Sequence, residues 1–258
     1  KPDYIAHDEE DFPWLELIYA DRLASCEKIL GTDRRRLIDI GSGAGFFLKT
    51  ATSRGWDVTG IEPSRQAAAY ARKMGNTVVE GFFNADTAPH LGRFDVVNAC
   101  NVLEHVPDPG EFLALTKKVL TPGGLICLDV PNDFTPFQAA ARAIAKSGEW
   151  WVVPHHHYNY FDFSGLVALL QRNGFSVVER STGFPMELFL LMGENYVGHP
   201  DLGRACHNKR KRFDMALEAI GAGETRRALY RAMAAAGIGR EIVLIAVLDE
   251  PGSHKNSD

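Results

Sequence analysis

The stretch from Leu37 to Leu48 constrains the fold more than any other part of the chain, and it reads LIDIGSGAGFFL. A short apolar run, a glycine-rich turn and an apolar helix start predict a buried parallel strand, a tight turn and a helix. Gly41 and Gly43 allow the turn and let a ligand lie against bare backbone at Ser42. Asp39 ends the strand, at the edge where open α/β sheets bind ligands. Its carboxylate can accept hydrogen bonds from a cationic ligand.

The glycine spacing distinguishes two kinds of nucleotide site. A dinucleotide site uses Gly-x-Gly-x-x-Gly, with the pyrophosphate on the helix N-terminus. This chain has Gly-x-Gly-x-Gly, and the position of the third glycine is Phe46. A phenyl ring there would hinder the close approach of helix and strand, and Asp39 suits a positive ligand better than a pyrophosphate. An NAD(P)-dependent oxidoreductase therefore stays only as the alternative interpretation.

Further segments follow in a fixed order along the chain. A strand within 56–64 ends in Glu62, about 20 residues beyond the glycine turn, where a carboxylate can accept both ribose hydroxyls of an adenosine. A strand at 94–100 runs into NVLEHVPDP, in which Asp108 and Pro109 are a helix cap and first-turn proline. A Pro-Gly-Gly turn then opens another apolar strand that ends near residue 132.

This ordered series resembles the class I S-adenosylmethionine-dependent methyltransferases, in particular the small-molecule type 11, 12 and 23 families. The resemblance covers about 36–182 and the last strand. It implies S-adenosyl-L-methionine as cofactor and S-adenosyl-L-homocysteine as product. It also implies that Asn101 lies beside the methionine moiety and that the turn at 81–83 flanks the adenine. The expected cofactor-binding residues are Asp39, Gly41, Ser42, Gly43, Glu62, Pro63, Phe82, Phe83 and Asn101, although Phe82 and Phe83 could equally be core residues.

The expected fold is α/β, a Rossmann-like sheet of seven strands, mostly parallel with an antiparallel last strand and helices on both faces. We expect an N-terminal helical flap over 1–35, a cofactor-binding core over 36–182 and 240–250, and a helical insertion over 183–239. A long loop without structure would be unusual, so the insertion is expected to form a lid over the acceptor site. Members of the family often carry a small zinc module upstream of this domain. The sequence starts at Lys1 and does not show whether such a module precedes it.

The first thirty residues allow two interpretations. Leu15, Ile18 and Leu23 have roughly helical spacing. A bland interpretation is a helix packed on the sheet edge. The functional one is a flap that closes over the cofactor, with aromatic side chains drawn from Tyr4, Phe12, Trp14 and Tyr19.

Methyl transfer from a sulfonium needs alignment and, for some acceptors, removal of a proton. Histidine is the natural base near neutral pH. His105, after the fourth strand, and His157, in a segment that resembles a family motif, are the candidate catalytic residues; each could instead be structural. Three histidines in a row, 155–157, point in alternating directions in an extended loop, so no metal site is expected. The expected acceptor-binding residues are Tyr19, Tyr158, Tyr160, Arg204, His207 and Lys211.

The basic run from Arg204 to Arg212 indicates either a solvated helix face or an anionic acceptor, for example a phosphorylated or nucleotide-linked sugar. We expect a small-molecule acceptor, with O-methylation of a sugar or secondary metabolite ahead of N- or C-methylation. A relative that binds the cofactor without catalysis is a further alternative.

Composition bounds the partners. The net charge of −5 argues against a general nucleic-acid surface. The four cysteines are far apart and lack a Cys-x-x-Cys pair, which fits free thiols in a reducing cytoplasm. No apolar run approaches the ~18 residues of a membrane span. A cytoplasmic monomer or homodimer is expected.

Overall fold

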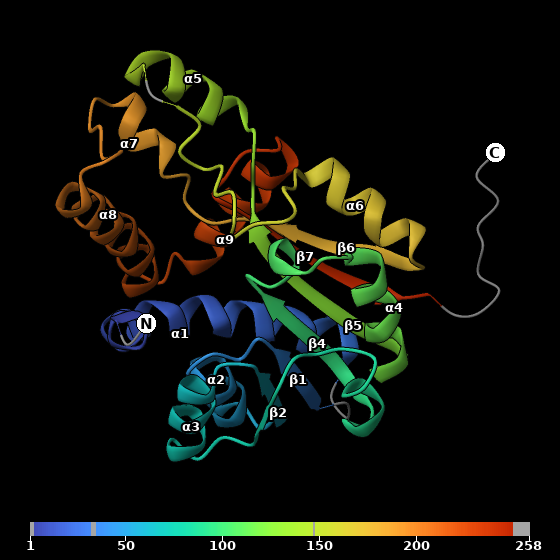
Figure 1. Ribbon diagram of the computed structural model, residues 1–258. Coiled ribbons are helices and arrows are strands. Elements are labelled where there is room, and N and C mark those ends of the chain that lie inside the picture. The colour runs from blue at the N-terminus through green and yellow to red at the C-terminus, as the bar shows by residue number, and fades with distance from the viewer. Residues whose placement is uncertain (1–2, 32–34, 147, 250–258) are drawn as a thin grey trace.

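A computed structural model describes residues 3–31, 35–146 and 148–249, with only the backbone described at residues 3 and 4 (Figure 1). The expected contribution of the Tyr4 ring to a flap lies outside the described part. So do the ends of two expected segments, at residues 1–2 and 250. Within the described ranges, no helix is both long and apolar enough to span a membrane.

The sheet confirms the expected fold class. Its seven strands lie in the order β3-β2-β1-β4-β5-β7-β6, and β7 runs antiparallel to both of its neighbours. The order reverses between β1 and β4, which makes the crevice at their carboxyl ends the expected ligand site. The strands are β1 (Arg36–Ile40), β2 (Asp57–Glu62), β3 (Val78–Glu80), β4 (Phe94–Cys100), β5 (Leu120–Pro131), β6 (Phe175–Ser181) and β7 (Glu241–Leu248).

Alternating side chains divide the central strands between two apolar layers. Leu37 packs on one face with α2 (Phe46–Ser53), while its neighbour Ile38 packs on the other with α4 (Pro109–Val119) and α6 (Phe163–Arg172). Because both faces are covered, the strands are apolar at nearly every position. The helix α3 (Arg65–Lys73) covers β2 and β3 on the side of α2, and the short helices η1 (Ala88–His90) and η2 (Leu103–His105) lie in the connections.

The N-terminal segment is one long helix, α1 (Asp3–Leu30). Its second half packs on a face of the sheet, where Leu23 and Cys26 contact Leu37 and Cys127. The expected helix packed on the sheet is therefore present, but it lies on a face of the sheet and not at its edge. The first half of α1 passes beyond the sheet and packs against Phe46, the residue that interrupts the dinucleotide pattern.

The insertion contains three helices, of which the last packs against β6. They are α7 (Glu187–Leu191), α8 (Pro200–Ala219) and α9 (Gly223–Ala235). In Figure 1 the arrowheads of β4 and β5 point towards the side where α1, α7, α8 and α5 (Pro136–Ala145) gather. The two longer helices, α8 and α9, fall within the helical insertion expected over 183–239. The sequence analysis missed α7 because so short a helix shows no clear periodicity.

Candidate functional site

The glycine turn brings three elements into close contact. The Gly41 N–H donates to the Ile61 carbonyl at 2.8 Å, which ties the end of β1 to β2. A side chain at Gly41 would meet Val102 at 2.7 Å, and one at Gly45 would meet Asn76 at 2.5 Å. Both glycines also have positive φ. The spacing of the motif thus has a steric reason at each end of the turn.

Glu62 lies beside the turn, held by backbone donors. Its carboxylate accepts one hydrogen bond from the Gly43 N–H at 2.9 Å and another from the Ser64 N–H at 2.7 Å. The side chain is 8% exposed. Each carboxylate oxygen has a second lone pair, so both can still accept from a ligand diol.

A buried polar chain crosses the floor of the crevice. Asn98 donates through Nδ2 to Asp39 at 2.6 Å and accepts from the Arg22 guanidinium at 3.2 Å. Arg22 also forms a short ion pair with Asp129 at the end of β5. Burial raises the pKa of Asp39 to about 7, although the Asn98 hydrogen bond and the Arg22 charge act in the opposite direction. Sequence analysis missed Arg22 because it lies on α1, far from every motif.

The buried polar chain of Arg22, Asp39, Asn98 and Asp129 lines a cleft of about 330 Å³, whose other walls include Tyr19, Ser42 and Asn101. Phe82, by contrast, is 69% exposed and Pro63 is exposed as well. The Phe83 ring packs against Phe112 at a centroid distance of 5.5 Å, so it belongs to the core. Of the two phenylalanines expected at the adenine, Phe82 is exposed, and Phe83 is half-buried against the core.

Asn101 stands between this cleft and a second cavity. It has a φ of 53°, a conformation that asparagine tolerates better than most residues. The second cavity, of about 270 Å³, shares Asn101 and Glu241 with the cleft. Its other walls include Asn132, Asp133, Gln138, Trp150, Trp151, His157, Glu187 and Arg240.

The two candidate histidines are neighbours, with ring centroids 5.0 Å apart. His105 Nδ1 lies 2.7 Å from the His156 carbonyl, and its Nε2 lies 3.7 Å from a Glu104 carboxylate oxygen. Glu104 is 1% exposed, and burial raises its pKa to about 7. The His157 pKa is lowered by burial and by the two neighbouring histidines. Sequence reasoning could not find this cluster, because Glu104 and His157 are far apart in the chain and come together only in the folded structure.

Of the three tyrosines expected to bind the acceptor, Tyr19 lines the cleft, whereas Tyr158 and Tyr160 are not among the walls of the second cavity. The Tyr158 ring is 69% exposed. The Tyr160 hydroxyl accepts a hydrogen bond from the Val153 N–H at 3.0 Å, and its ring lies against Phe134 and His157. Tyr160 therefore supports the loop that carries His157.

The expected basic face exists on α8, but an acid on α1 occupies it. Asp11 contacts Arg204 at 4.0 Å and His207 at 2.7 Å, and it forms a short ion pair with Lys211. Asp11 is only 9% exposed, so its carboxylate is buried between the two helices. The ion pairs therefore join α1 to α8. The expectation that these three side chains bind an acceptor loses its support.

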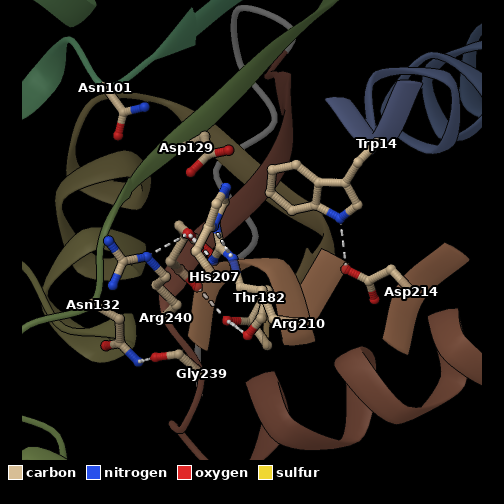
Figure 2. Close-up of polar contacts among 12 residues, drawn as sticks. Trp14, Asn101, Asp129, Asn132, Thr182, His207, Arg210, Asp214, Gly239 and Arg240 are labelled. Atoms are coloured by element: carbon tan, nitrogen blue, oxygen red, sulfur yellow. Dashed lines mark hydrogen bonds and ion pairs between the residues drawn. The ribbon is translucent and has the colours of Figure 1, made fainter. Parts of the chain in front are cut away.

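Another residue of α8, Arg210, reaches the cleft instead. Its guanidinium lies over the Trp14 ring at 4.7 Å and 3.5 Å from Glu241. Figure 2 shows this group with Arg240, which contacts Glu241 at 3.2 Å, and with Asp214, which accepts from the Trp14 indole at 2.8 Å. The insertion and α1 thus close one side of the cleft together.

The fold and the acidic groups around the glycine turn define the class: a Rossmann-like methyltransferase of class I. A family model for the methyltransferase domain matches residues 14–180. The chain belongs to that family, and the expectation of a class I S-adenosylmethionine-dependent methyltransferase is confirmed. The alternative of an NAD(P)-dependent oxidoreductase has no support among these matches.

Relatives and solved structures agree on the fold. The chain is 37% identical over 131 residues to the ubiquinone biosynthesis O-methyltransferase of Caulobacter sp. (strain K31), covering 47% of this chain and 51% of that protein. It is 26% identical over 160 residues to the C-methyltransferase NovU of Streptomyces niveus, covering 60% of this chain and 36% of NovU. The chain thus spans about half the length, or less, of these curated relatives.

Among solved structures, the plantazolicin methyltransferase BpumL in complex with SAH has a TM-score of 0.58 at 15% identity, covering 96% of this chain and 89% of that one. A SAM-dependent methyltransferase from Archaeoglobus fulgidus has a TM-score of 0.58 at 19% identity, covering 95% and 99%. At these identities the similarity concerns the fold alone.

Proposed function

We propose that this chain transfers the methyl group of S-adenosylmethionine to a small-molecule acceptor. The observation that carries the proposal is the placement of Asp39 and Glu62 on either side of the glycine turn, at the carboxyl ends of β1 and β2. A carboxylate at 62 suits the ribose diol, and the acid at 39 suits the cationic methionine end. The methyl group would then lie near Asn101, where the cleft meets the second cavity.

The second cavity supports a neutral, polyhydroxylated acceptor such as a sugar. Its indole walls can stack on a sugar ring, and Asn132 and Gln138 can hydrogen-bond hydroxyl groups. Three acids, Asp133, Glu187 and Glu241, outnumber the single arginine at its wall. An anionic acceptor is therefore less well supported than the sequence alone indicated. O-methylation follows from this choice of acceptor, with the hydroxyl oxygen as nucleophile.

His105 and His157 lie beside this cavity and can act in two ways on an acceptor hydroxyl. They can accept its proton directly, or they can hold a cation that lowers its pKa. We further propose that α1 and the insertion form the lid, since Asp11, Trp14 and Arg210 join them across the cleft.

The decisive experiment is incubation with methyl-labelled S-adenosylmethionine and pools of sugars, nucleotide-linked sugars and amines, followed by mass spectrometry. We expect the label in a hydroxylated product. Tight binding of S-adenosylhomocysteine without turnover on any pool would favour a non-catalytic relative. Failure to bind S-adenosylhomocysteine would contradict the proposed function as a whole.

Cofactor affinity is expected to rise with pH between about 6 and 8. Burial raises the pKa of Asp39 to about 7, so below that pH its carboxyl is largely protonated and cannot attract a cation. Binding in that range must displace the proton, and affinity falls by up to ~10-fold per pH unit below the pKa. Isothermal titration at several pH values checks this. Asp39→Asn should remove the dependence, whereas a slope that persists in that variant would assign it to another group.

Replacing Lys211 with methionine is expected to lower stability without affecting the acceptor. Lys211 is 16% exposed and paired with Asp11, so its loss should cost about 1–2 kcal/mol of unfolding free energy. The acceptor KM should stay unchanged. Lys209→Met is the matched control, because the exposed Lys209 pairs only with Glu194 among the ion pairs described. A large rise in acceptor KM for Lys211→Met would restore the idea of a basic acceptor site.

A further inference from the structure

One buried carboxylate and two histidines converge beside the second cavity, and one of the three, His157, lines it. One ligand atom from each of Glu104, His105 and His157 lies within 4.8 Å of the other two. The His105 Nε2 to Glu104 oxygen distance is 3.7 Å. Two atoms that bind one ion tetrahedrally at ~2.1 Å stand roughly 3.4 Å apart. The His105–Glu104 pair is therefore close to the spacing of a coordination shell, and small side-chain rotations would bring separations of up to 4.8 Å onto one ion.

When the hydrogen-bond donors and acceptors of this cluster are assigned, several of its atoms are left with lone pairs that face one another. The His156 carbonyl can only accept, so the His105 Nδ1 at 2.7 Å must donate to it. In the neutral ring, Nε2 then presents a lone pair to the Glu104 carboxylate. A second Glu104 oxygen, Oε2, and the His157 Nδ1 are buried without a hydrogen-bond partner in the described part of the chain. Unsatisfied buried polar atoms are costly, and a shared cation would satisfy them.

Backbone contacts hold the two segments together before any ligand arrives. The N–H groups of Tyr158 and Asn159 donate to the Glu104 carbonyl at 2.8 and 3.1 Å. The Asn159 amide also donates to the Val106 carbonyl at 2.7 Å and to the Leu103 carbonyl at 3.2 Å. A ring N–H bound to a backbone carbonyl, as in His105, is the usual support of a metal-binding histidine.

We propose that Glu104, His105 and His157 bind one first-row divalent cation of the zinc type, with an open position towards the second cavity. Two imidazoles and one carboxylate favour Zn²⁺, Co²⁺ or Fe²⁺ over Mg²⁺ and Ca²⁺, which prefer oxygen ligands. Three protein ligands leave room for one more donor, as catalytic zinc sites do. Sequence analysis expected no metal site because the three adjacent histidines point in alternating directions. Of these three, only His157 belongs to the cluster.

The site would act on the acceptor of the proposed function, and only this step rests on that function. An acceptor hydroxyl at the open position would have a lower pKa and lose its proton to solvent. The oxygen–carbon bond then forms as the sulfur–carbon bond breaks, and sulfur keeps the electron pair as S-adenosylhomocysteine. The histidines thus serve as ligands and not as the base.

The test is metal binding by the full chain, measured apart from activity. Protein freed of metal with a chelator is titrated with Zn²⁺ and Mg²⁺ by calorimetry, and with Co²⁺ by visible absorption. We expect one Zn²⁺ site, a Co²⁺ spectrum typical of mixed nitrogen and oxygen ligands, and no comparable Mg²⁺ binding. Glu104→Gln and His157→Gln should weaken Zn²⁺ binding by at least about 10- to 100-fold, while His156→Gln, which alters an adjacent exposed histidine, should not.

Two outcomes would overturn the proposal: a wild-type chain that binds no stoichiometric Zn²⁺, or variants that bind it as tightly as the wild type. Should the buried Glu104→Gln fail to fold, the more exposed His105→Gln provides the same comparison, since the His105 side chain is 45% exposed. S-adenosylhomocysteine titration of the chelated protein separates the two claims. Binding of S-adenosylhomocysteine without binding of Zn²⁺ would contradict the proposed metal site but not the proposed function.

Discussion

Replacing Glu62 with alanine is expected to weaken S-adenosylhomocysteine binding by roughly 100- to 10,000-fold. Two hydrogen bonds from a ribose diol to the carboxylate of Glu62, a residue that is 8% exposed, are worth about 1.5–3 kcal/mol each. The substitution also removes the acceptor that holds the Gly43 N–H, so the turn itself loses support. Isothermal titration of the wild type and the variant measures the loss directly.

Glu80→Ala is the matched control for that prediction. Glu80 is the register partner of Glu62 on the neighbouring strand, but its side chain is partly exposed and pairs with Arg65 and Arg72. Its loss should leave cofactor affinity nearly unchanged. Equal melting temperatures for the two variants would exclude a folding defect. If Glu62→Ala bound the ligand as well as Glu80→Ala did, the cofactor would have to lie elsewhere.

Replacing Arg22 with methionine is expected to lower the unfolding free energy by about 3–5 kcal/mol, because removal of one partner leaves a buried charge uncompensated. The Arg22 side chain is 3% exposed and that of its partner Asp129 is 11% exposed. Arg22 also donates to Asn98, so the orientation of that amide towards Asp39 would change. Urea denaturation followed by circular dichroism gives the difference.

An exposed pair supplies the comparison for Arg22. Arg36 contacts Asp57 at 3.3 Å with both side chains more than half exposed, so Arg36→Met should cost no more than about 1 kcal/mol. Adding Asp129→Asn to Arg22→Met should recover part of the loss, because the unpaired charge is then removed. An Arg22→Met chain as stable as Arg36→Met would contradict the prediction that the buried Arg22–Asp129 pair supports the fold.

Local patterns were sufficient for the sheet and for the cofactor end of the site. Strand 94–100 was predicted with the bounds that the structure has, and the next helix begins at Pro109 with Asp108 as its cap, as expected. Asp39 and Glu62 could be placed because parallel strands end at one edge of a sheet. Features that depend on one helix or strand, or on the end of one strand, can be predicted because the residues that determine them are neighbours in the sequence.

The acceptor side was predicted less well, because its contacts join residues far apart in the chain. Arg204, His207 and Lys211 do share a helix face, but nothing near them in sequence showed that Asp11 would lie against it. A tyrosine is a common ligand-binding residue, but the Tyr160 hydroxyl instead accepts a hydrogen bond from the backbone of its own loop. Position on a helix is a local property, whereas the partner of a charge is not.

The sequence by itself determined the α/β fold, the bend at the glycines and the two acids that flank it, since each depends on residue type and short spacing. Only the tertiary structure decided that Arg22 reaches under the crevice, that α8 is bound to α1, and that Glu104 meets His157. These are pairings across long stretches of chain, fixed by how apolar faces pack, and no spacing in the sequence encodes them.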